Sequence, residues 1–61
     1  MERNSDQLLR LLRADGWIEV RQRGSHRTLK KSGIAELITV PHPEKDLPKG
    51  LVRRIYKIAG W

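Results

Sequence analysis

The chain has 61 residues, and its 13 lysines and arginines against seven aspartates and glutamates give a formal net charge of +6 at pH 7. A chain of this length buries one small core, so we expect a single domain over residues 1–61. Because it contains no cysteine, disulfides and thiolate zinc sites are excluded. No apolar run is longer than two residues, so we expect no signal peptide and no membrane span, and we place the protein in the cytoplasm.

Positive charge is concentrated in the middle of the chain. No acidic residue occurs between Glu19 and Glu36, and this interval holds five cations: Arg21, Arg23, Arg27, Lys30 and Lys31. Most charge runs are simply solvated surface. A cluster of cations without interleaved acids, however, gains affinity for nucleic acid by displacing counterions from phosphates. We therefore expect a nucleic acid partner.

The N-terminal segment is predicted to be a helix. Four leucines recur there at the i, i+3, i+4 spacing of a helix with one buried side: Leu8, Leu9, Leu11 and Leu12. Either Asn4 or Ser5 can cap the start, and Gly16 suits the left-handed position that ends a helix. These signals predict a helix over about residues 5–14.

A strand is predicted next, because the pattern over residues 17–23 changes to period two. Its apolar positions, Ile18 and Val20, are expected to be buried, while Arg21 and Arg23 project outward. The strand ends before a glycine, where the chain can turn.

Gly24-Ser25 supplies that turn, and residues 26–30 are expected to return as the second strand of a hairpin. Leu29 is the only large apolar residue of this stretch and is expected to point inward. Side chains alternate along a strand, so parity places three residues on the opposite, open face: His26, Thr28 and Lys30.

Residues 35–41 are predicted to form a third strand, which Pro41 and Pro43 end. Pro48 suits the first turn of a second helix, and Gly60 can end it. The apolar residues of this helix recur at helical spacing: Leu51, Val52, Ile55, Ile58 and Ala59. The element order predicts an α+β two-layer domain in which two helices cover one face of a three-stranded antiparallel sheet.

The aromatic residues are few: Trp17, Tyr56 and Trp61. The stacking strand of an RRM is therefore missing. Trp17 and Tyr56 are expected in the core, and Trp61 is expected to fold back onto the domain.

Two histidines are candidates for chemistry. Cleaving RNA without a metal needs a group that takes the 2′-hydroxyl proton, one that protonates the leaving oxygen, and cations near the phosphate. His26 is the candidate proton acceptor, although on spacing alone an ordinary surface histidine is the commoner outcome. His42 could complete an acid/base pair, but we favour a structural role in which its ring packs or hydrogen-bonds at the end of the third strand. His26, His42 and Glu44 lack the spacing of a zinc site, so we expect neither metal nor cofactor.

Over residues 5–61 the chain carries several short motifs in a fixed order. They are Asp15-Gly16-Trp17, RQRGSH at 21–26, TVPHP at 39–43, DLPKG at 46–50 and a closing Ile58-Ala59-Gly60. Together these motifs resemble the HicA toxins of bacterial and archaeal toxin–antitoxin systems. The resemblance implies a fold like that of a double-stranded-RNA-binding domain and an mRNA interferase activity that needs no metal. It also implies a HicB-like antitoxin partner that covers the active site.

The resemblance carries the family's catalytic histidine, which follows Gly-Ser, onto His26. Two positions depart from the family: Arg27 stands where members often have a second histidine, and Leu29 where they often have an aromatic residue. An additional arginine could strengthen phosphate binding. The residues expected to hold the RNA backbone around His26 are Arg21, Arg23, Ser25, Arg27 and Lys30.

The leading hypothesis is thus a toxin that acts as a metal-independent endoribonuclease on mRNA. The alternative is a non-catalytic double-stranded-RNA-binding module that uses the same sheet and helix-terminal lysines. A third hypothesis is a small adaptor that folds fully only on a protein partner, because a core of this size is marginal.

Overall fold

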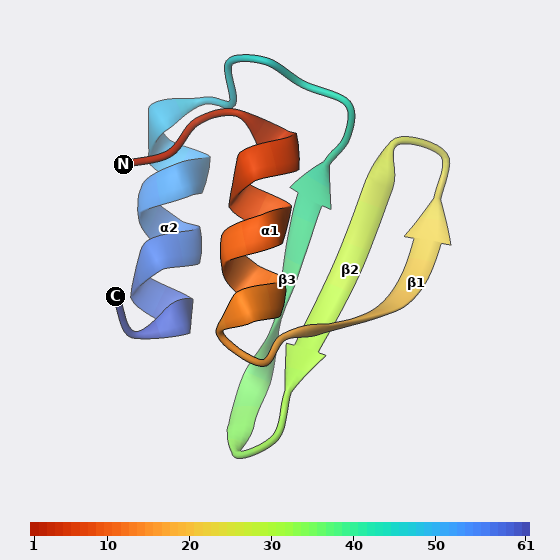
Figure 1. The fold of residues 1–61 in the computed structure, drawn as a ribbon, viewed down its shortest axis with the longest axis vertical. Helices are drawn as coiled ribbons and strands as arrows, with labels where there is room; N and C mark the ends of the chain where they lie inside the picture. The colour runs from red at the N-terminus through yellow and green to blue at the C-terminus, as the bar shows by residue number, and fades with distance from the viewer.

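The computed structural model describes residues 1–61 and contains two helices and three strands (Figure 1). They are α1 (Ser5–Ala14), β1 (Ile18–Arg23), β2 (His26–Lys31), β3 (Ile34–Pro41) and α2 (Lys49–Ala59). The strands form one antiparallel sheet in the order β1-β2-β3, and both helices pack on the same face of it. The predicted α+β two-layer fold is confirmed.

α1 begins where Asn4 caps it, because the Asn4 Oδ1 atom accepts a hydrogen bond from the Gln7 backbone N–H at 3.2 Å. Ser5 therefore lies inside the first turn. Three of the four predicted leucines are buried: Leu8, Leu9 and Leu12. Leu11 is 45% exposed, so its expected place in the core is wrong. A helix lying on a sheet buries one side only, and Leu11 falls at the rim of that side.

The predicted burial of β1 is also wrong: Ile18 and Val20 are 63% and 48% exposed. Ile18 pairs with Lys30 and therefore lies on the face that the helices leave uncovered, and a β-bulge between Glu19 and Arg21 leaves Val20 unpaired. Beyond the bulge the parity of β1 changes, so an uninterrupted period-two pattern misassigns it. The helices also lie over the β3 side of the sheet, where they leave β1 uncovered (Figure 1).

The central strand β2 has two distinct faces. Leu29 points into the core, paired with Ile38, and Val40 is buried on the same side. Thr28 shares the other face with Thr39, and their Oγ1 atoms are 3.2 Å apart. The inward orientation of Leu29, and with it the predicted alternation along β2, is confirmed, but Thr28 is only 4% exposed and so is not open to solvent as expected.

α2 begins one residue after Pro48, which occupies the N-cap position rather than the first turn. Gly60 ends the helix with φ 77°, in the left-handed region as predicted. The predicted apolar stripe faces the sheet: Val52, Ile55 and Ala59 are buried, and Leu51 and Ile58 are partly buried. The structure contains no helix that is both long and apolar enough to span a bilayer.

The aromatic residues behave as predicted. Trp17 is buried in the core, and Tyr56 packs partly buried against it. Trp61 folds back so that its ring meets Tyr56 edge to face, with ring centroids 4.9 Å apart, and its Nε1–H donates to Asp15 Oδ2 at 3.1 Å.

The two adjacent leucines of α1 give the first prediction. Leu12→Ala should lower the free energy of unfolding by about 2–5 kcal/mol, because Leu12 is fully buried and its truncation leaves a cavity. Leu11→Ala is the matched control and should cost less than about 1 kcal/mol, since this side chain is nearly half exposed. Urea titrations of both variants measure this difference, and equal losses would contradict the packing described above.

Candidate functional site

The sheet face that the helices leave uncovered carries one histidine and several cations. β2 contributes His26 and Lys30, and β1 contributes Arg21 and Arg23. Arg23 is directly opposite His26 in the antiparallel register, so the two side chains are neighbours on one face. All four side chains are exposed, and none of the cations takes part in an ion pair. We call this set, Arg21, Arg23, His26 and Lys30, the basic open face.

Ser25 lies in the turn between β1 and β2, immediately before His26, and is exposed. The turn is tight because Gly24 adopts φ 54°, a conformation that glycine reaches without steric cost. The carbonyl of Ser25 accepts a hydrogen bond from the backbone N–H of His42. The turn is therefore tied to the chain that follows β3, which fixes where β2 begins.

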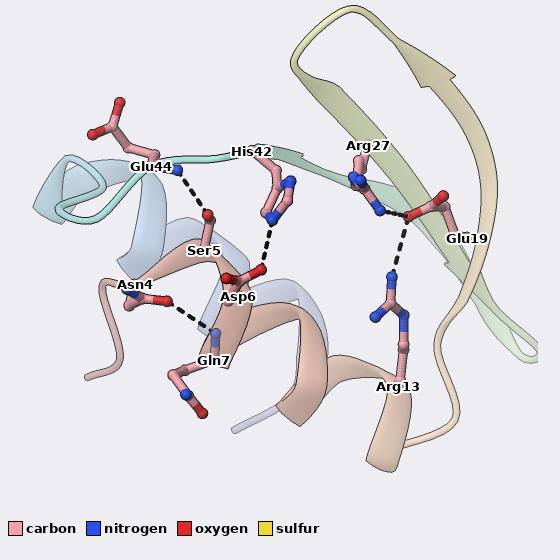
Figure 2. A network of polar contacts seen from close by, with 9 residues as sticks. All are labelled: Asn4, Ser5, Asp6, Gln7, Arg13, Glu19, Arg27, His42 and Glu44. Carbon is pink, nitrogen blue, oxygen red and sulfur yellow. Dashed lines mark hydrogen bonds and ion pairs between the residues drawn. The ribbon is translucent and has the colours of Figure 1, made fainter.

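Arg27 is separated from the basic open face. Its Nη1 atom lies 3.4 Å from Glu19 Oε1, and the same oxygen is 3.4 Å from Arg13 Nη2 of α1 (Figure 2). The Arg27 Nε atom is buried and has no hydrogen-bond partner. Arg27 thus sits between the sheet and α1. The signal was in the sequence, because Arg27 precedes the inward-pointing Leu29 by two residues and so shares its face.

His42 has the structural role that we favoured. Its ring is turned toward α1, where Nε2 lies 2.6 Å from Asp6 Oδ1 (Figure 2). His26, in contrast, projects from the open face, so the two imidazoles do not form one acid/base pair. Asp6 carried no signal in the sequence, because 36 positions separate it from His42.

Asp6 is held in its ionised form. The hydrogen bond from His42 holds the pKa of the Asp6 carboxyl below its usual value of 3.8 against the opposing effect of desolvation, and the positive charges of Arg10 and Arg27 lower it further. An ionised carboxylate can only accept hydrogen bonds, so the Nε2–H of His42 is the donor.

A second group of unpaired cations lies on α2. α2 carries four of them and no acid in its first turn: Lys49, Arg53, Arg54 and Lys57. Four other cations do form ion pairs, with acids that lie near α1 or in the loop before α2: Arg3, Arg13, Arg27 and Lys31. The structure brings together no group of three or more histidine, aspartate or glutamate side chains that could hold a metal ion.

The fold and this site together define a small basic α+β domain that presents an imidazole and unpaired cations on an uncovered sheet face. The family model described as the HicA toxin of bacterial toxin–antitoxin systems matches residues 5–61. A solved structure titled "HicA3 and HicB3 toxin-antitoxin complex" contains a chain that is 43% identical, with a TM-score of 0.78 over 92% of this chain and 91% of that chain. No curated protein matches. The chain belongs to the HicA toxin family, which confirms the resemblance seen in the sequence.

The Asp6 carboxyl gives a pH prediction. Because its pKa is lower in the folded state than in the unfolded chain, ionised Asp6 stabilises the fold above about pH 4, and this contribution is lost as the pH falls through the folded-state value. Asp6→Asn removes the charge but keeps an acceptor oxygen. The parent should therefore have a higher thermal midpoint than Asp6→Asn at about pH 6, and the two midpoints should converge as the pH falls to about 2. A constant difference across this range would contradict the prediction.

Proposed function

We propose that this chain is the toxin of a toxin–antitoxin pair and cleaves mRNA without a metal, with His26 as the acid/base residue. The observation that carries the proposal is the position of His26, exposed at the first residue of β2 and opposite Arg23, in a chain of the HicA family. An imidazole beside an unpaired guanidinium supplies both a proton acceptor and a positive charge for a phosphate.

In the proposed reaction, His26 takes the proton of a ribose 2′-hydroxyl, and the 2′ oxygen attacks the adjacent phosphorus. The bond from phosphorus to the 5′ oxygen breaks, leaving a 2′,3′-cyclic phosphate on one fragment and, once the leaving oxygen is protonated, a 5′-hydroxyl on the other. Arg23 and Arg21 stabilise the negative charge that builds on the phosphate oxygens. His26 is assigned the proton transfer because the His42 ring faces α1 instead.

The RNA backbone is proposed to lie along the basic open face, with Ser25 at the adjoining turn as a further contact. Lys30 extends the positive surface along β2 from His26. Arg27 is better assigned to its ion pair with Glu19 of β1 than to RNA, because its guanidinium faces α1. In this assignment the Arg27 charge stabilises the strand that carries His26 and does not bind the substrate.

A HicB-like antitoxin is the proposed protein partner, docked on the basic open face so that it covers His26. The similar solved chain belongs to a HicA3–HicB3 complex. The same face also exposes Ile18, opposite Lys30, and Leu37 of β3, which is 49% exposed. These apolar side chains give a protein partner contacts that RNA phosphates cannot use. The proposed substrate places the activity in the cytoplasm, where mRNA is translated.

The alternative remains a non-catalytic double-stranded-RNA-binding module. The unpaired cations of α2 favour it, because recognition by shape and phosphate contacts uses cations from several elements. Cleavage and salt dependence separate the two functions.

His26→Ala tests the catalytic assignment. With a labelled mRNA and excess EDTA, the parent should produce fragments, and the variant should cut at least about 100-fold more slowly, because general acid–base catalysis contributes at this scale. RNA affinity should change by less than about threefold, and circular dichroism checks that both proteins are folded. Parent-like cleavage by the variant would remove His26 from the mechanism, while binding without cleavage by either protein would favour the alternative.

Arg23→Gln tests the RNA path, with Arg53→Gln on α2 as a control that makes the same charge change elsewhere. If RNA follows the basic open face, Arg23→Gln should weaken binding and reduce the slope of log K against log salt by roughly one, while Arg53→Gln leaves the slope unchanged. Filter binding over a series of salt concentrations measures both slopes. Equal effects of the two variants would show that α2 also binds phosphate.

A further inference from the structure

The segment that follows β3 is held at three points by the elements around it, and Figure 2 shows the two that join it to α1. The backbone N–H of His42 donates to Ser25 O in the turn before His26. The His42 side chain is bonded to Asp6 of α1 at 2.6 Å. Two residues later, Glu44 and Ser5 exchange two hydrogen bonds, each 2.9 Å long.

His42 is the residue that joins the proposed active-site turn to the helix layer. Pro41, the residue before it, pairs with His26 across β2 and β3. The His42 N–H thus adds one hydrogen bond to the β2–β3 ladder, at the carbonyl of the residue before His26. The His42 side chain points the other way and contacts Asp6 of α1. Its ring is 18% exposed, so the side chain is mostly enclosed at this junction.

The partner of His42 is itself fixed. Asp6 lies in the first turn of α1, beside Ser5, which is 2% exposed and bonded to Glu44. The Asn4 cap holds the start of the same turn. Asp6 is 67% exposed, yet its position is set by a rigid helix start rather than by a mobile chain. The groups facing the pair are the guanidinium of Arg10 on α1 and that of Arg27 on β2.

We propose that Asp6 and His42 are positioning residues, which tie the Gly24–Ser25 turn to α1 through His42 and thereby orient the His26 imidazole for cleavage. This inference rests on the proposed function for its effect on cleavage, although the structural coupling can be measured without RNA. The Asp6–His42 pair lies at the start of α1, on the helix side of the sheet and away from the basic open face. Its loss therefore lowers the rate of the chemical step and leaves RNA binding unchanged, because a misplaced catalytic group costs rate rather than affinity.

Four variants test the effect on cleavage. Asp6→Ala and His42→Ala should each lower kcat by about tenfold, with KM within about twofold of the parent. Asp6→Asn keeps an oxygen that accepts from His42 Nε2–H, so it should restore most of kcat. The double variant Asp6→Ala/His42→Ala should be no slower than either single variant, since both remove one interaction.

Ile55→Val controls for lost stability. Ile55 is buried on α2 and makes none of the hydrogen bonds that hold the turn or the segment after β3, so this substitution should lower the thermal midpoint by several degrees without changing kcat below the transition. If Ile55→Val lowered kcat as much as Asp6→Ala at a matched midpoint, the pair would be structural only and the proposal would be overturned.

Amide hydrogen exchange measures the coupling without RNA. The His42 N–H is protected by its bond to Ser25 O, and Asp6→Ala should reduce that protection at least about tenfold. The Trp17 N–H, bonded to Leu12 O at the far end of α1, should keep its protection in the same sample. Unchanged protection at His42 would overturn the positioning role whether or not the protein cuts RNA. Loss of protection together with a parent that cuts no RNA would uphold the coupling and refute the proposed function instead.

Discussion

Burial of Leu29 determines which side of the sheet can do chemistry. Side chains alternate along β2, so fixing Leu29 against Ile38 in the core also fixes His26 and Lys30 on the opposite face. A slip of one residue would bury an imidazole and expose the leucine, at the combined cost of lost apolar burial and a desolvated polar ring. The packing of the core and the placement of the proposed active site therefore depend on the same register.

The positive charges of the chain have two roles that sequence position does not distinguish. Arg13, Arg27 and Lys31 are each held by an acid close to α1, where they help to join the helix to the sheet. Arg21 and Arg23, only a few positions away, have no acidic partner. A cation that already has a partner must give up that contact to bind a phosphate, so the unpaired cations are the ones available for a polyanion.

Local patterns were enough to predict the helices, the central strand and the grouping of His26 with Arg21 and Arg23, because helical spacing and strand alternation report burial directly. They failed at β1, because Ile18 lies opposite Lys30 on the uncovered face and a bulged residue then changes the parity, so that Arg21 and Arg23 share that face. Counting charges placed Arg27 with the RNA contacts, although alternation from Leu29 would have placed it inward. The Asp6–His42 contact joins residues that are far apart in the sequence, so it could not be predicted from local patterns.

The bulge at Val20 affects how copies of the molecule can associate through their sheet edges. β1 is an edge strand, and a regular edge offers a row of free N–H and C=O groups on which another chain can add a strand. The extra residue interrupts that row and increases the local twist, and the two arginines that follow repel an identical edge. The irregularity that leaves Val20 unpaired thus also protects the chain from edge-to-edge aggregation.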